Sequence, residues 1–115
     1  MNDFLLIFRR DQSIENQFTP EQLKEISKPW QDWMGSLAAQ NKLADRGNRL
    51  DIEGRVIKPG ALVTNGPYVE VKEAVGGYIV IRAASLDEAA EIAKGCPILN
   101  ANGCVEVRQI VKMEM

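Results

Sequence analysis

Three ionisable side chains stand within four positions near the middle of the chain, and their types could support acid-base chemistry. Glu70, Lys72 and Glu73 follow the turn-forming residues 65–67, which read Asn-Gly-Pro. A carboxylate withdrawn from water has a raised pKa and can accept a proton, while a neighbouring cation stabilises the negative charge that develops. We therefore interpret Glu70 and Glu73 as candidate catalytic residues for proton abstraction from, or isomerisation of, a small organic acid.

Polar and aromatic groups from other segments would complete a small pocket, either between sheet and loop or at a dimer cleft. Glu106 and Arg108 lie two positions apart and so share one face of a strand, lining a barrel interior as a charge pair or facing solvent. Lys72 or Arg108 would stabilise the developing charge. The candidate ligand-binding residues are Asn65, Tyr68, Lys72, Tyr78, Glu106 and Arg108.

A simpler interpretation of the central segment stays open. Glu70, Lys72 and Glu73 could form ion pairs that hold the loop, and Asn65 could simply cap the turn. In that case these residues determine the conformation of the loop and have no catalytic role.

The residue types that are missing restrict the chemistry further. The chain contains no histidine. This removes the Ser-His and Cys-His dyads and the usual zinc and iron ligand sets. We predict neither a metal nor a cofactor. Cys96 and Cys104 are expected to be reduced thiols packed in or near the core, and Cys96 has no histidine base to activate it.

Length, charge and hydropathy favour one ordinary globular domain spanning residues 1–115. The 115 residues are 45% hydrophobic and carry a formal net charge of −2. This balance lacks the basic excess that nucleic-acid binding requires. No segment approaches the roughly 20 apolar residues that cross a bilayer, and the start of the chain lacks the pattern of a signal peptide. We expect a soluble, cytoplasmic protein with neither nucleic-acid nor membrane partners.

Three apolar runs predict the strands that would position these residues. Residues 4–8 and 77–83 carry apolar side chains on both faces, which is typical of strands buried on two sides. Residues 104–111 alternate, so Val105 and Val107 point one way while Glu106 and Arg108 point the other.

Two helices are predicted from their caps and apolar spacing. Thr19, Pro20 and Gln22 form a capping box with proline at the first helical position. The stripe that follows should pack on a core, and Pro29 predicts a kink or break within it. A second box at 85–88 starts a shorter helix. The stripe consists of Leu23, Ile26, Trp30, Trp33 or Met34, and Leu37.

Residues 43–63 read as a strand and a hairpin with loose boundaries, interrupted by three glycines. Basic residues outnumber acidic ones there, which would suit an anionic ligand. A solvated hairpin is the preferred explanation, because runs of charge usually face water. The basic residues are Arg46, Arg49, Arg55 and Lys58, and Lys42 directly precedes the segment.

The order of these elements matches an α+β, ferredoxin-like split β-α-β arrangement with both helices on one face of an antiparallel sheet. The other face would then leave apolar side chains in water, and large exposed apolar patches are rare on soluble monomers. We therefore predict a homodimer in which two sheets close face to face.

Motifs along most of the chain resemble a known family. They are Asn-Gly-Pro-Tyr-Val-Glu-Val-Lys-Glu at 65–73, Gly-Gly-Tyr at 76–78, Leu-Asp-Glu-Ala at 86–89, Cys-Pro at 96–97 and Val-Glu-Val-Arg at 105–108. In these the chain is similar to the YciI-related proteins of the Asp-Gly-Pro-Phe type. The resemblance implies a ferredoxin-like fold assembled as a dimeric α+β barrel, in small bacterial proteins. Asn65 and Tyr68 stand where that motif has Asp and Phe.

Two functions follow from these observations. The first is a ligand-binding or regulatory module with a polar pocket at the 65–73 loop, which would take a small anionic organic ligand. The alternative is a small enzyme that moves a proton with Glu70 or Glu73. The lack of histidine and the untitratable Asn65 favour the first function, whereas the charged loop favours the second.

Overall fold

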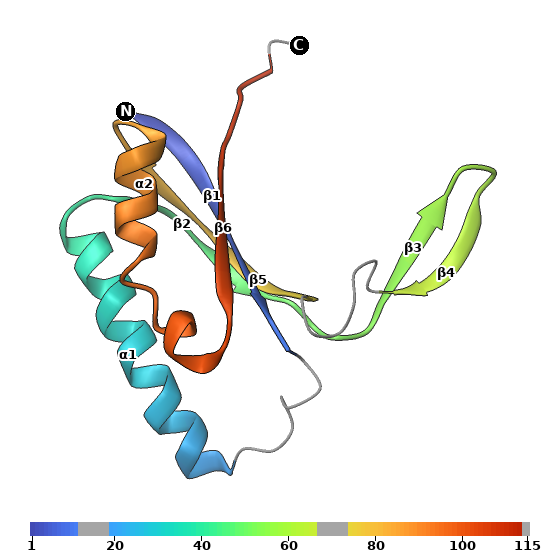
Figure 1. The fold of residues 1–115 in the computed structure, drawn as a ribbon, viewed down its shortest axis with the longest axis horizontal. Helices are drawn as coiled ribbons and strands as arrows, with labels where there is room; N and C mark the ends of the chain where they lie inside the picture. The colour runs from blue at the N-terminus through green and yellow to red at the C-terminus, as the bar shows by residue number, and fades with distance from the viewer. Residues whose placement is uncertain (12–18, 67–73, 114–115) are drawn as a thin grey trace.

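The computed structural model describes residues 1–11, 19–66 and 74–113. Four strands form one antiparallel sheet in the order β2-β5-β1-β6. Helices α1 and α2 lie on the same side of this sheet (Figure 1), which confirms the predicted ferredoxin-like α+β fold. None of the described helices is long and apolar enough to cross a membrane. The elements are β1 (Asn2–Arg10), α1 (Pro20–Ala39), β2 (Leu43–Arg49), β5 (Ala74–Ala83), α2 (Leu86–Ala93), the 3-10 helix η3 (Pro97–Ala101) and β6 (Cys104–Gln109).

Alternation along the two central strands separates a core face from an open face. Phe4, Leu6 and Phe8 of β1 are buried against the helices. Leu5 and Ile7 point to the opposite side and are only half-buried, because both described α-helices lie across the sheet from them. The burial of residues 4–8 on both faces, expected from their composition, is therefore complete on one face only.

The start of α1 forms as the sequence predicts. The Thr19 hydroxyl accepts a hydrogen bond from the Gln22 amide at 3.1 Å, and the Gln22 side chain accepts one from the Thr19 amide at 2.9 Å. The helix then continues through Pro29 without ending, so of the two predicted outcomes, a kink or a break, the break does not occur. Proline removes one helical hydrogen bond, but the cap on one side and core packing on the other hold both flanking segments in helical conformation.

The second half of α1 carries the contact with the core. Leu37 is buried, and Trp30, Trp33 and Met34 pack against the core cluster. The predicted apolar stripe is wrong for the first half, because Leu23 and Ile26 remain 45% and 37% exposed. The apolar side chains in this half of α1 therefore keep surface that a ligand or another molecule could contact.

The end of α1 is clamped to the sheet by Arg82 of β5. Its guanidinium Nη1 donates to the carbonyl oxygens of Asn41 and Leu43 at 3.3 and 3.2 Å. Its backbone amide donates to the Lys42 carbonyl at 2.7 Å. The turn between α1 and β2 is thus anchored, which fixes the direction in which the helix leaves the sheet.

The predicted hairpin forms a separate two-stranded sheet, β3 (Gly54–Lys58) with β4 (Leu62–Gly66). The expected turn at 65–67 is wrong for its described residues, because Asn65 and Gly66 lie in β4 opposite Arg55 and Gly54. The chain turns at 59–61 instead. Asparagine and glycine permit a turn but do not impose one, and strand pairing favours an extended conformation here.

Strand β2 contains a bulge at Gly47, where only glycine fits. The register against β5 shifts between Asp45 and Asn48, which flank this residue, and its φ of 63° lies in the left-handed region. A Cβ at this position would collide with the carbonyl oxygen of Tyr78.

Gly47→Ala should therefore lower the free energy of unfolding by about 2 kcal/mol or more, through left-handed strain and collision with the strand behind it. Denaturant titration followed by circular dichroism measures the loss. Gly60→Ala is the matched control, because Gly60 has a φ of 81° and open space around a Cβ, and about 1 kcal/mol is expected there. Equal losses of unfolding free energy in the two variants would contradict the role of the close approach between Gly47 and the Tyr78 carbonyl oxygen.

Candidate functional site

A cleft of about 650 Å³ lies between the first half of α1 and the end of the sheet where β1 ends and β5 begins. This volume is within the range of small-molecule sites. Its walls come from α1, β1, β2, β5 and η3, so it forms only when the whole domain is folded. It lies where the apolar face of α1 is left uncovered by the core.

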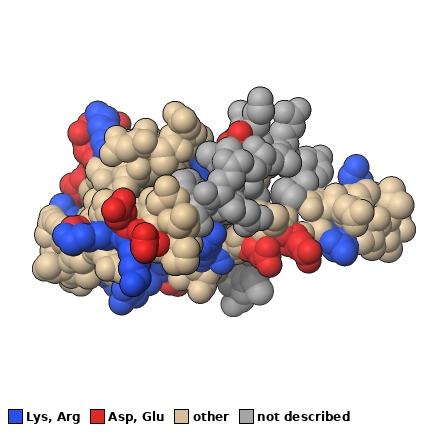
Figure 2. Space-filling model, turned by 90° about the horizontal axis from the view of Figure 1, so that it is seen from below, with Lys and Arg blue, Asp and Glu red and all other residues tan. Residues whose placement is uncertain are grey.

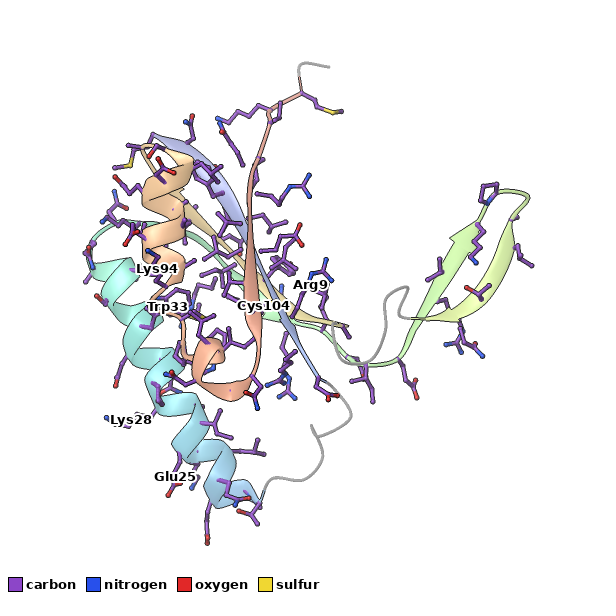
Figure 3. All side chains as sticks on the ribbon, in the orientation of Figure 1. Arg9, Glu25, Lys28, Trp33, Lys94 and Cys104 are labelled. Atoms are coloured by element: carbon purple, nitrogen blue, oxygen red, sulfur yellow. The ribbon has the colours of Figure 1, made fainter. Side chains whose placement is uncertain are left out.

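Apolar and aromatic side chains form the inner wall of the cleft. The rings of Phe8 and Trp30 meet edge to face, with centroids 4.9 Å apart and planes at 85°. Trp33 packs edge-on against both rings and lies between α1 and the sheet (Figure 3). Such edge-to-face contacts stabilise an aromatic cluster by more than the burial of its apolar surface alone. The wall is therefore preformed, and it also includes Leu23, Ile26, Met34, Ile79 and Ile98.

Four basic side chains surround this apolar wall. Arg10 comes from β1, Lys24 from α1, and Arg46 and Arg49 from β2, whereas no Asp or Glu is among the described residues that line the cleft. The side chains of Lys24 and Arg46 form no ion pair within the described ranges. One sign of charge beside a low-dielectric wall raises the local concentration of anions.

The bulge in β2 determines where the basic residues of that strand stand. The Gly47 amide donates to the Asp45 carboxylate at 2.7 Å, and this short loop interrupts the alternation of side chains. Bulges re-aim neighbouring side chains in this way. The basic excess at 43–63 did indicate Arg46 and Arg49. Arg10 and Lys24 were missed, because each is isolated in the sequence and joins the cleft only through tertiary structure.

Half of the predicted site lies outside the described residues. Tyr68, Glu70, Lys72 and Glu73 belong to this group, so the catalytic hypothesis for Glu70 and Glu73 stays a prediction. Among the others, Asn65 lies in the separate β3–β4 sheet, apart from the four-stranded sheet.

Tyr78, Glu106 and Arg108 do share one sheet. Ile7 of β1 stands between Tyr78 of β5 and Glu106 of β6 in the paired register. Tyr78 also contributes to the edge of the cleft, and its hydroxyl accepts a hydrogen bond from the Asn48 side-chain amide at 3.3 Å. These groups therefore belong to the open face and its edge, while most of the cleft lies on the helix side.

An ion cluster occupies the β6 side of the open face. Glu106 accepts from Arg9 Nε at 3.2 Å and from Arg108 Nη1 at 3.2 Å. Arg9 points away from the helices (Figure 3). Hydrogen bonds from Arg108 and Arg9 hold the pKa of the Glu106 carboxyl below its usual range. The carboxylate therefore stays ionised at neutral pH and is a poor proton acceptor.

Both cysteines are free thiols, as predicted. Cys96 is buried, and burial raises its pKa to about 11, so it is almost fully protonated and weakly nucleophilic at neutral pH. Cys104 is exposed, and the expectation that it packs in or near the core is wrong, because it lies at the start of an edge strand. Within the described ranges, no group of His, Cys, Asp and Glu residues could hold a metal ion.

Comparison with known proteins identifies one family. The sequence profile of the YCII-related domain matches residues 4–114. A search of curated proteins finds no match. The matched range contains both α-helices, the β3–β4 hairpin and every residue that lines the cleft.

Glu106→Gln should flatten the dependence of stability on pH under acidic conditions. Because the folded-state pKa is lowered, the ion cluster stabilises the fold above the unfolded-state pKa and loses this effect as the pH falls through the folded-state pKa. Urea titrations between about pH 3 and 6 measure the slope.

Glu91→Gln is the control for this change, because Glu91 pairs with Lys94 at 2.6 Å on the exposed side of α2, and such pairs contribute little. Parallel curves for wild type and Glu106→Gln would contradict the proposed origin of the lowered pKa.

Proposed function

The chain belongs to the YCII-related family, and on this premise we propose that it is a ligand-binding module whose cleft beneath α1 takes a small organic anion with an apolar body. One observation supports this function above others. A preformed aromatic wall stands beside four basic side chains, and no acidic residue is among the described lining.

The two parts of the cleft would act on different parts of such a ligand. An apolar body would cover Phe8, Trp30 and Ile26, and burying about 150 Å² of apolar surface stabilises a complex by about 4 kcal/mol. Lys24 and Arg46 would donate charge-assisted hydrogen bonds to a carboxylate or phosphate, each contributing about 1.5–3 kcal/mol. The entropic cost of association leaves affinities on the order of 10–1000 µM.

Binding is favoured over catalysis by the same lining. A general acid or base must reach the proton that it transfers. None of the described lining residues is Asp, Glu, His or Cys, and Glu106 lies on the open face with a lowered pKa. The described lining would therefore hold the ligand without offering it a carboxylate, imidazole or thiol for proton transfer.

Octanoate and 4-phenylbutyrate, each compared with the corresponding alcohol, test this function. We expect the carboxylates to bind more tightly than the alcohols, detected by isothermal titration calorimetry and by the combined fluorescence of Trp30 and Trp33. Arg46→Ala should weaken carboxylate binding about tenfold and leave the alcohols unchanged. Ile26→Glu should weaken both classes, because Ile26 contacts the apolar body, and should weaken the carboxylates more, because the new carboxylate repels them.

Arg55→Ala is the matched control, because it removes an arginine from the distant hairpin and should not alter affinity. Equal binding of acids and alcohols would contradict the role of the basic residues. Loss of affinity in Arg55→Ala equal to that in Arg46→Ala would contradict the location of the site.

A further inference from the structure

The two halves of α1 are attached to the domain in different ways. Every residue of the first half, 20–28, is exposed, whereas the second half packs on the core through Trp33 and Leu37. Within the described ranges, side chains of residues 20–28 form hydrogen bonds and ion pairs only inside the helix and its cap. The β3–β4 hairpin protrudes from the end of the molecule away from α1 (Figure 2), so it does not restrain this half.

The backbone of α1 is weakest where the packed half begins. Pro29 has no amide hydrogen, so the Glu25 carbonyl lacks its helical partner, and the proline ring crowds that carbonyl. Just before it, the Ser27 hydroxyl donates to the Lys24 carbonyl at 3.1 Å, and side-chain hydrogen bonds of this kind often bend helices. Both features are recognised causes of helix bending, and they occur together at the boundary between the two halves.

The ion pair that spans this boundary is weak. Lys28 Nζ lies 3.6 Å from Asp32, and the two side chains are 78% and 70% exposed. Lys28 points away from the sheet (Figure 3), and surface pairs of this kind contribute little. The capping box of Thr19 and Gln22 closes the other end of this half. The first half can therefore turn about Pro29 while it stays helical.

The inner side of the first half carries groups that suit a ligand. Leu23, Lys24 and Ile26 line the cleft together with the sheet residues Phe8 and Ile79. A small organic acid fills only part of about 650 Å³. A turn of the first half toward the sheet would bury the exposed surface of Leu23 and Ile26 and bring the Lys24 ammonium closer to an anion.

We propose that residues 20–28 form a lid, hinged at Pro29, that closes over the ligand of the cleft. The inference rests on the proposed function and adds the motion by which the site excludes water. The closed lid contacts the apolar body through Leu23 and Ile26 and the anionic group through Lys24. Because a ligand touches these groups fully only in the closed state, its binding shifts the population toward closure.

Hydrogen exchange of the free protein tests the hinge. We expect the amides of residues 24–28 to exchange at least about tenfold faster than those of residues 33–39, which the core holds. Pro29→Ala restores the missing amide and should slow exchange at 24–28 about fivefold or more, because the helix is then continuous.

Gly35→Ala is the matched control for Pro29→Ala. It also raises helix propensity, at an exposed position of the packed half where a Cβ meets open space. It should leave exchange at 24–28 unchanged. Equal exchange in the two halves of wild type, or equal slowing by both substitutions, would overturn the hinge.

Saturating octanoate tests closure onto a ligand. We expect it to slow exchange at 24–28 about tenfold in wild type. Calorimetry should show that Pro29→Ala binds octanoate about fivefold more weakly, because the closed state is less populated, and that Gly35→Ala binds it as wild type does. The far-ultraviolet circular dichroism should not change on binding, because the lid is already helical. A gain of helical signal would show that the segment folds onto the ligand, and would overturn the hinged lid.

The outcomes separate the lid from the proposed function. Octanoate that binds wild type without slowing exchange at 24–28 would overturn the lid and leave the binding function standing. If neither octanoate nor 4-phenylbutyrate binds, the proposed function and closure onto a ligand are both overturned. The exchange rates of the free protein still decide whether the hinge at Pro29 exists.

Discussion

The fold depends on the alternation of side chains along two neighbouring antiparallel strands. In β1 the side chains of Phe4, Leu6 and Phe8 enter the core while Leu5 and Ile7 leave it. Strand β5 repeats this pattern with Ile79 and Ile81 in the core. A shift of one residue in their pairing would exchange the two faces completely. Because residues 4–8 of β1 and 79–81 of β5 are apolar on both faces, the sheet has a second apolar face that α1 and α2 do not cover.

The second half of α1 is held against the domain, whereas its first half is left partly exposed. The Arg82 clamp and the packing of Trp33 and Leu37 hold its second half. The first half keeps Leu23 and Ile26 partly in water, which costs hydrophobic stabilisation that full packing would have provided. Exposed apolar surface of this kind commonly marks interaction sites on soluble proteins. In this protein the exposed apolar surface of α1 borders a cleft that basic residues surround. The combination of apolar and basic groups distinguishes this surface from an imperfectly packed core.

The cleft and the open face receive side chains from consecutive residues of the same strand. Ile79 faces the cleft, whereas Val80 faces the open side. Strand alternation thus allows one short segment to contribute to the cleft on one side of the sheet and to the open face on the other. The bulge at Gly47 adjusts only the edge strand β2, so it can re-aim Arg46 and Arg49 without disturbing the pairing of β1 with β5.

Local chemistry determined much of this protein from its sequence alone. The capping box at Thr19, the cap at Ser85 and the alternation in β6 depend on neighbours within four residues, so they could be predicted without knowledge of the rest of the chain. The ferredoxin-like order followed from those elements.

Only the tertiary structure decided which of several locally acceptable conformations was adopted. Asn65 and Gly66 could turn or extend, and pairing with β3 chose the extended form. Leu23 and Ile26 belong to an apolar stripe, but the direction of α1 is set by contacts at its other end. Arg10 and Lys24 join Arg46 beside one cleft from different elements. Their proximity depends on long-range packing, which no local pattern in the sequence contains.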